Sequence, residues 1–188
     1  MENKLQLIRR SDLITAAWCG GTTTQLFIYP PDAEYAQRNF IFRISTATVV
    51  AERSDFTPLP GFHRKLMVLE GSLHIYHKDR YSKQLKKFEQ DSFEGSWQTS
   101  AEGKGTDFNL MTAAGAKGTL EPIAMESGAL TALEVREKCF IYVYKGRIRF
   151  NGEEGSAGDV VCIEDPGELI ISAMERSELV ITSVSLGV

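Results

Sequence analysis

The fold is decided by a stretch that the chain carries twice: residues 66–76 read LMVLEGSLHIY, and residues 141–150 read IYVYKGRIRF. Each copy has an apolar run, a polar residue, a glycine and a second run in which apolar and polar side chains alternate. Alternation with period two is typical of a strand with one buried face, and a glycine between two such runs indicates a turn. The repeat therefore predicts two equivalent strand turns, at Gly71 and Gly146.

The same order of features continues beyond the two glycines. Gln90-Asp91 in the first half corresponds to Gly158-Asp159 in the second, and the apolar run at 108–111 corresponds to the run at 179–182. Two hairpins can look alike by chance, but three matched features in one order favour a duplication. Their order is typical of a cupin-type jelly roll. We therefore expect an all-β bicupin, with two tandem cupin-type jelly-roll β-barrels packed together. Residues 1–118 form the N-terminal barrel with the ligand pocket, and residues 119–188 a mainly structural C-terminal barrel, to which N-terminal strands can cross over.

The other periodic stretches are also short and rich in β-branched or aromatic residues, and they are bounded by Gly, Pro, Asp or Ser. The runs predicted as strands lie at 40–45, 65–70, 73–76, 108–112, 140–144 and 169–172. No pattern indicates a helix longer than two turns, and a single turn is expected at 32–37, after Pro30-Pro31.

Composition restricts the class of protein. The 188 residues are 43% hydrophobic and 24% charged with a net charge of −4, which is typical of a folded globular chain. A mildly acidic balance without blocks of Lys and Arg excludes nucleic acid as a partner, and the absence of a long apolar run excludes a membrane segment. Three widely spaced cysteines indicate reduced thiols. We expect a cytoplasmic protein and leave a homo-oligomer open.

The ligands of a metal cupin are missing from the first half. Enzymatic cupins hold a metal with an H-x-H pair, a following Glu and a third His, because imidazole and carboxylate suit divalent ions. Counting back from Gly71 places Arg64 at the Glu position, with Pro58 and Pro60 near the paired His positions. The third His position falls near Trp97 or Gln98. We expect no metal and no other cofactor.

The second half lacks the ligands as well, because the Glu region holds Cys139 and no His follows His77. His74 and His77 resemble a ligand pair, but residues three apart on a strand point to opposite faces, so we interpret them as surface hairpin residues. His63 lies at a turn that enters a strand. It can be a hydrogen-bonded residue of that turn or a contact to a ligand.

A polar group remains inside two apolar strands. Arg43 and Ser45 share one face of the first strand, and Asp107 and Asn109 share one face of the second. A buried guanidinium is unfavourable unless it is paired or faces a wet cavity, and its two-pronged geometry suits a carboxylate. The pattern predicts a ligand pocket. The alternatives are an Arg43–Asp107 ion pair and an Arg43 that faces solvent.

The corresponding part of the second half has a different pattern. Lys145, Arg147 and Arg149 alternate with apolar residues that include Ile148 and Phe150. This alternation indicates a solvated face over a core face, so the C-terminal barrel is interpreted as structural.

These residues resemble the HutD/Ves family of bacterial bicupins over most of the chain. The motifs that carry the resemblance are Trp18 with Gly20-Gly21-Thr22-Thr23, Phe42-Arg43-Ile44-Ser45, Pro60-Gly61-Phe62-His63-Arg64, Leu69-Glu70-Gly71 and, above all, Asp107-Phe108-Asn109-Leu110-Met111-Thr112. The sequence departs from the family pattern where Cys19 follows Trp18 directly and where Gln25 stands in place of an expected Glu.

The resemblance implies a bicupin without an established enzymatic activity. It also implies a small ligand from histidine utilisation, such as a formyl or formimino compound of glutamate or urocanate, and a role in modulating that pathway. Arg43, Arg64, Asp107 and Asn109 match the motif residues.

Three hypotheses follow from the sequence. The first is a metal-free binder of a small polar or carboxylated metabolite, with the ligand-binding residues Arg43, Ser45, His63, Arg64, Asp107 and Asn109. The second is an enzyme that acts on a small acid with His63 and Asp107 as acid and base. The third is an interaction module without a ligand.

Overall fold

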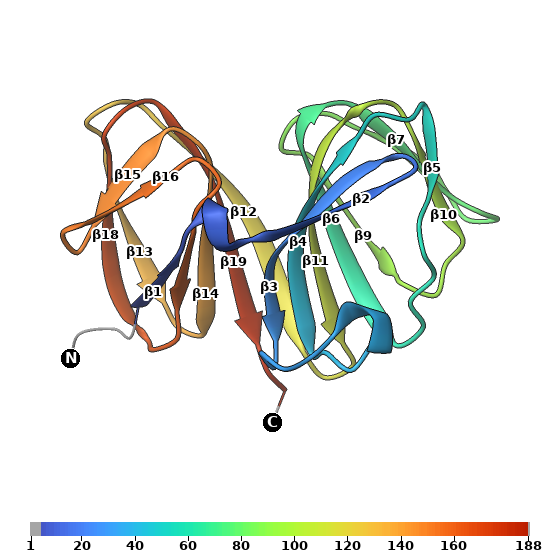
Figure 1. Ribbon diagram of the computed structural model, residues 1–188, viewed down its shortest axis with the longest axis horizontal. Helices are drawn as coiled ribbons and strands as arrows, with labels where there is room; N and C mark the ends of the chain where they lie inside the picture. Colours follow the sequence, from blue (N-terminus) through green and yellow to red (C-terminus); the bar gives the residue numbers. More distant parts are fainter. Residues whose placement is uncertain (1–4, 188) are drawn as a thin grey trace. The chain divides into compact units, whose positions relative to one another are not determined.

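The computed structural model describes residues 5–187, and these residues are almost entirely β-structure (Figure 1). Each of the six runs predicted as strands falls on a strand, and no α-helix occurs between residues 5 and 187. The turn expected at 32–37 is the 3-10 helix η2 (Tyr35–Gln37), and a second short helix, η1 (Arg10–Asp12), lies near the start. In the described part of the chain, no helix has the length and apolar character needed to cross a membrane.

The chain divides into two compact units. The N-terminal unit is Ile14–Ala116, and the C-terminal unit combines residues 5–13 with Lys117–Gly187. The division falls two residues before the boundary expected from the sequence, because the first strand of the second repeat begins at Lys117. Each unit is described below by itself.

The N-terminal unit has two sheets with the strand orders β2-β3-β4-β11-β6-β9 and β5-β10-β7-β8. The bounds of the ten strands are β2 (Ile14–Trp18), β3 (Gly21–Tyr29), β4 (Phe42–Val49), β5 (Arg53–Asp55), β6 (Phe62–Gly71), β7 (Leu73–His77), β8 (Ser82–Leu85), β9 (Gln90–Glu94), β10 (Thr99–Glu102) and β11 (Gly105–Ala113).

The C-terminal unit has the strand orders β1-β17-β14-β19-β12 and β13-β18-β15-β16. The bounds of its nine strands are β1 (Leu5–Ile8), β12 (Lys117–Met125), β13 (Leu130–Val135), β14 (Lys138–Lys145), β15 (Arg147–Phe150), β16 (Glu153–Ser156), β17 (Val160–Ile163), β18 (Gly167–Ala173) and β19 (Ser177–Ser185).

The strand orders show the duplication directly. Adding eight to each strand number converts β4-β11-β6-β9 into β12-β19-β14-β17, and β5-β10-β7-β8 into β13-β18-β15-β16. Each repeat is therefore an eight-stranded jelly roll of two sheets, and β1, β2 and β3 are additions to the repeats. No strand pairing among the described residues joins the two sheets of a unit, so each jelly roll is a two-layered sandwich and not a barrel closed by hydrogen bonds.

The two predicted glycine turns lie at equivalent places. Gly71 joins β6 to β7 and Gly146 joins β14 to β15, and in each case the chain passes from one sheet of its unit to the other. Both glycines have a left-handed backbone, with φ of 77° and 85°. A side chain is strained in this conformation, and a Cβ would lie 2.3 Å from the Lys104 carbonyl oxygen at Gly71 and 2.3 Å from Ser177 Oγ at Gly146.

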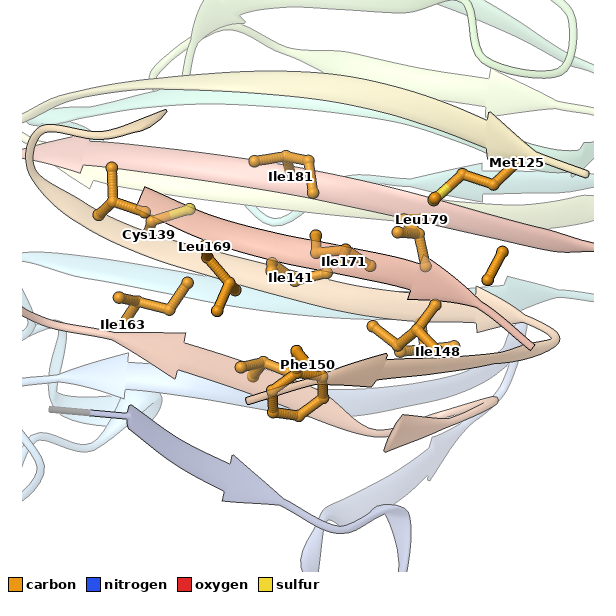
Figure 2. Packing of buried hydrophobic residues seen from close by; sticks show 14 residues of the cluster. Met125, Cys139, Ile141, Ile148, Phe150, Ile163, Leu169, Ile171, Leu179 and Ile181 are labelled. Atoms are coloured by element: carbon orange, nitrogen blue, oxygen red, sulfur yellow. The ribbon is translucent and has the colours of Figure 1, made fainter. Parts of the chain in front are cut away.

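The interior of the C-terminal unit is apolar. Its core contains fourteen buried residues from both sheets of that unit, among them Cys139, Leu179 and Ile181 (Figure 2). Arg147 and Arg149 point outward while Ile148 and Phe150 are buried, as the alternation predicted. The burial of this apolar area stabilises the unit.

The N-terminal unit has an apolar core over part of its interior only. Leu66 and Val68 on β6 pack against Leu73 and Ile75 on β7. On the face of β4, β6 and β11 that looks inward, polar side chains replace the apolar ones, and these side chains form the candidate site.

Candidate functional site

The N-terminal unit contains a cavity of about 540 Å³, here called the N-terminal cavity. The polar side chains that line it include Gln25, Arg43, Ser45, Arg64, Asp107 and Asn109, and the aromatic and apolar ones include Ile14, Trp18, Tyr35 and Phe56. A few convergent polar groups in a largely apolar recess are the usual make-up of a small-molecule site.

Strand register brings the polar residues together. Met111 on β11 pairs with Arg43 on β4 and with Arg64 on β6, so the two arginines flank the same residue. Asn109 pairs with Ser45 one step further along the same face, and Asp107 follows it. Because side chains alternate along a strand, all of these residues project from one face of the sheet.

Arg43 is held by neutral groups. Its Nε donates to Gln25 Oε1 over 2.9 Å, and its Nη1 donates to Ser45 Oγ over 3.2 Å. The guanidinium carbon lies 4.4 Å from the centre of the Tyr35 ring. Burial lowers the pKa of Arg43, and the nearby Tyr35 phenol opposes this effect. Within residues 5–187 Arg43 forms no ion pair with Asp107, so the expected structural alternative does not describe its contacts.

Arg64 is 6% exposed and also lacks a carboxylate in direct contact among the described residues. Its Nη2 donates to Asn109 Oδ1 over 3.1 Å, and its Nε is buried without a partner. The rings of Phe56 and Phe93 lie 4.9 and 5.4 Å from the guanidinium carbon. Burial lowers the pKa of Arg64 to about 10, which leaves the group protonated near neutral pH.

Asp107 is 2% exposed and accepts a hydrogen bond from Asn109 Nδ2. Burial raises the pKa of its carboxyl to about 7, although the charge of Arg64 and the hydrogen bond from Asn109 act in the opposite direction. The cavity thus holds two buried guanidinium groups and one buried carboxyl group that is half protonated near neutral pH. Buried charge of one sign is unfavourable without a counter-charge, so the site is suited to an anion.

Five of the six residues expected to bind a ligand line the cavity: Arg43, Ser45, Arg64, Asp107 and Asn109. His63 does not, because it is adjacent to Arg64 on β6 and therefore projects from the opposite face. There His63 Nδ1 lies 3.1 Å from Glu94 Oε1 and its Nε2 lies 2.9 Å from Ser92 Oγ. The expected acid–base pair of His63 and Asp107 is therefore not assembled.

Sequence reasoning did not place Tyr35 or Gln25 in the site. Tyr35 lies in η2, a segment without periodicity, so no pattern marked its direction. Gln25 carried a usable signal, because it stands where the family pattern has an acidic residue, and in the structure it pairs with Ser45 on β4.

The interpretation of His77 as a surface hairpin residue is wrong. His74 and His77 do point to opposite faces of β7, but His77 is buried and not a surface residue. Its Nε2 lies 2.9 Å from Asp91 Oδ2 and its Nδ1 lies 2.8 Å from Thr99 Oγ1. These two partners compensate the loss of water around the imidazole.

The donor set of the N-terminal cavity does not fit a metal ion. Its only carboxylates are Asp55 and Asp107, no His or Cys lines it, and the Glu position of metal cupins is occupied by the cation Arg64. No group of three or more His, Cys, Asp or Glu residues between residues 5 and 187 is placed to hold a metal. A second arginine close to these groups further disfavours a divalent cation.

Solved structures with the same architecture define the class of protein. A conserved protein of unknown function from Pseudomonas aeruginosa is 20% identical, with a TM-score of 0.80, and the match covers 97% of this chain and 99% of that one. HutD of Pseudomonas fluorescens is 17% identical, with a TM-score of 0.73 and coverage of 96% and 99%. YhhW of Escherichia coli, a bacterial pirin, is 14% identical, with a TM-score of 0.76 and coverage of 95% and 97%. The fold is that of a bicupin.

The family follows from the sequence itself. The HutD family model matches residues 10–181, so the chain belongs to the HutD family. No curated protein gives a significant match to the chain.

Proposed function

We propose that the N-terminal unit binds a small carboxylate-bearing metabolite without a metal ion, with Arg43 and Arg64 as anion anchors. The observation that carries this proposal is the pair of buried arginines in one cavity, neither of which has a carboxylate partner among the described residues. A bound carboxylate would supply the missing counter-charge through charge-assisted hydrogen bonds.

The family suggests where such a ligand would come from. Formyl and formimino compounds of glutamate and urocanate all carry a carboxylate, and a HutD-like role would be to modulate histidine utilisation in response to one of them. The structure of the Pseudomonas fluorescens protein was determined in a formate condition. All three cysteines are free thiols, which supports a cytoplasmic location.

A thermal-shift screen of small carboxylic acids tests the proposal. A ligand at 100 times its Kd should stabilise the protein by about 2.7 kcal/mol, so a true ligand raises the melting temperature measurably. Arg43→Ala should weaken binding tenfold or more, because each charge-assisted hydrogen bond contributes about 1.5–3 kcal/mol. Arg43→Lys should restore part of the affinity, since an ammonium lacks the planar two-pronged geometry.

The matched control is Lys145→Ala, a charge removed from the C-terminal unit. Unchanged binding in Arg43→Ala together with a large loss of stability would contradict the ligand role. Elemental analysis of protein purified without chelators should find no stoichiometric transition metal. Tightly held iron, manganese, zinc or nickel would exclude the metal-free site.

A further inference from the structure

The N-terminal cavity has hydrogen-bond donors that no protein group uses. Within residues 5–187, Nη2 of Arg43, Nη1 of Arg64 and the hydroxyl of Tyr35 make no hydrogen bond. Tyr35, Arg43 and Arg64 all line the cavity, and the Arg43 guanidinium carbon lies 4.4 Å from the centre of the Tyr35 ring. Unused donors on Arg43 of β4, Arg64 of β6 and Tyr35 of η2 are thus available in one cavity.

Asp107 offers an acceptor in the same cavity. Asn109 donates to Oδ1 of Asp107, and Oδ2 has no partner in the described part of the chain. The hydrogen bond between Arg64 and Asn109 places the guanidinium level with Asn109, two residues from Asp107 along β11. Asn109 thereby bridges the Arg64 guanidinium and the Asp107 carboxyl, and all three side chains line the same cavity of about 540 Å³, which is room for a small acid.

We propose that the N-terminal unit catalyses proton transfer at carbon 3 of a bound 2-oxo acid, with Asp107 as the base. The inference rests on the proposed function, because it requires a carboxylate in the N-terminal cavity. It goes beyond that function because it assigns an activity and a class of substrate.

The donors match this class of acid. A 2-oxo acid presents three oxygens on one edge, two from the carboxylate and one from the adjacent carbonyl, and the cavity presents unused donors on Arg43, Arg64 and Tyr35. The carbonyl is also what makes the neighbouring C–H bond acidic enough for a protein base, because the charge left on carbon moves to the carbonyl oxygen. Arg64 and Tyr35 can stabilise that oxygen as the charge develops.

The step is a proton transfer from carbon to the Asp107 carboxylate. Asp107 takes a proton from carbon 3, so that the C–H bond breaks, an O–H bond forms on the carboxyl group, and the electron pair moves through carbons 3 and 2 to the carbonyl oxygen. Return of a proton from Asp107 to carbon 3 regenerates the 2-oxo acid, and protonation of the oxygen instead gives the enol. No oxidant, reductant or metal is consumed.

The surroundings of Asp107 suit this role. Its charged and titratable neighbours around the cavity are Arg43 on β4, Arg64 on β6, Tyr35 on η2 and Asp55 on β5. Burial raises the pKa of Asp107 to about 7, and a general base is most effective when its pKa is near the working pH.

Hydrogen–deuterium exchange tests the inference. Pyruvate, 2-oxobutanoate and 2-oxoglutarate are incubated with the full-length protein in D2O, and loss of the carbon 3 proton signal is followed by NMR. We expect exchange at least tenfold faster than in buffer, with a rate per bound acid that rises as Asp107 ionises with pH. Asp107→Asn should keep acid binding and lose exchange, because the amide retains the shape and the Asn109 contact but cannot take the proton.

His63→Ala is the matched control, since His63 lies outside the cavity and should leave exchange unchanged. Binding without exchange in the wild-type protein, or equal exchange in Asp107→Asn, would overturn the activity and leave the binding function standing. Failure of every 2-oxo acid to bind while other carboxylic acids do would also overturn it. Failure of all carboxylic acids to bind would overturn the proposed function itself.

Discussion

The two units follow one strand plan, yet among the described residues polar groups occupy the inward face at the centre of the larger sheet in the N-terminal unit, whereas apolar residues occupy it in the C-terminal unit. Asp107 pairs with Val68 and Asn109 with Leu66, three and five residues before Gly71. In the C-terminal unit, the residues at the same places are Leu179 and Ile181, which pair with the positions three and five residues before Gly146. The match of 108–111 with 179–182 that the sequence predicted is therefore out of register by one residue.

By the same count, Cys139 is the residue of the C-terminal unit that corresponds to Arg64, since each lies seven residues before its glycine. Cys139, Leu179 and Ile181 all belong to the apolar core of the C-terminal unit (Figure 2). Burial raises the pKa of the Cys139 thiol to about 11, so this residue stays neutral where Arg64 is charged. The jelly roll therefore accommodates either apolar side chains that stabilise the fold, or polar side chains around a cavity, which reduce the buried apolar area.

The two units should differ most in stability when an asparagine replaces the residue at equivalent positions of β19 and β11. Leu179→Asn puts an unpaired amide into a fully buried apolar site and should lower the free energy of unfolding by about 4 kcal/mol. Asp107→Asn should leave the free energy of unfolding unchanged or raise it, because the carboxyl is ionised at a cost in the folded state. Denaturant unfolding at pH 7 measures both. Similar losses in the two variants would contradict the comparison.

The glycine turns provide the next largest effect. Gly71→Ala and Gly146→Ala should each lower the free energy of unfolding by about 2 kcal/mol or more, from the left-handed backbone and the close contacts that a Cβ would make. Gly152→Ala is the matched control, since Gly152 has φ of 80° but nothing within 4 Å of an added Cβ, so only the backbone effect of about 1 kcal/mol is expected. A silent substitution at either turn would show that the turns are not equivalent.

The affinity for a carboxylic acid should depend on pH in the N-terminal unit. Asp107 is protonated below about pH 7 and charged above it, and a negative charge beside the bound carboxylate is unfavourable. The affinity should be constant between pH 5 and 6 and fall as pH rises through 7, by at most about tenfold per pH unit for one linked proton. Isothermal titration calorimetry in a pH series measures this. A pH-independent affinity in the wild-type protein, or an unchanged profile in Asp107→Asn, would contradict the assignment.

His63→Ala should have the smallest effect. The contacts of His63 with Glu94 and Ser92 lie on the solvent side of β6, with 40% of the His63 side chain exposed, and exposed pairs contribute about 0–1 kcal/mol. We expect a change of less than about 1 kcal/mol in the free energy of unfolding and no change in acid binding. A tenfold loss of affinity would place His63 in the site after all.

The sequence was sufficient for most of the site because period two is a reliable guide to the face of a strand. It placed Arg43 with Ser45 and Asp107 with Asn109, and all four line the cavity. The same rule, applied to the neighbours His63 and Arg64, separates them onto opposite faces. The prediction of His63 as a ligand contact relied on the turn before it, and a turn does not show to which face of the following strand a side chain points.

Contacts between residues that lie far apart in the sequence could not be predicted in this way. Tyr35 contacts Arg43 from a 3-10 turn, and the buried ring of His77 is within hydrogen-bond distance of Asp91 and Thr99 on other strands. Strand periodicity carries no information about such partners, because they depend on how the sheets pack. The glycine turns and the duplicated order were readable, since each is a local pattern that occurs twice.

The pairing of β1 with β17 has a consequence for synthesis on the ribosome. Leu5 on β1 pairs with Ile163 on β17, so β1 leaves the ribosome well before the strand with which it pairs. At about 5–20 residues per second this delay is on the order of ten seconds, during which the N-terminal unit can already fold. Until β1 pairs with it, β17 is an open sheet edge with unpaired backbone groups, and other chains can pair with such an edge. A truncation that removes the first thirteen residues should therefore favour aggregation through the C-terminal unit, even though it leaves the whole cavity of the other unit in place.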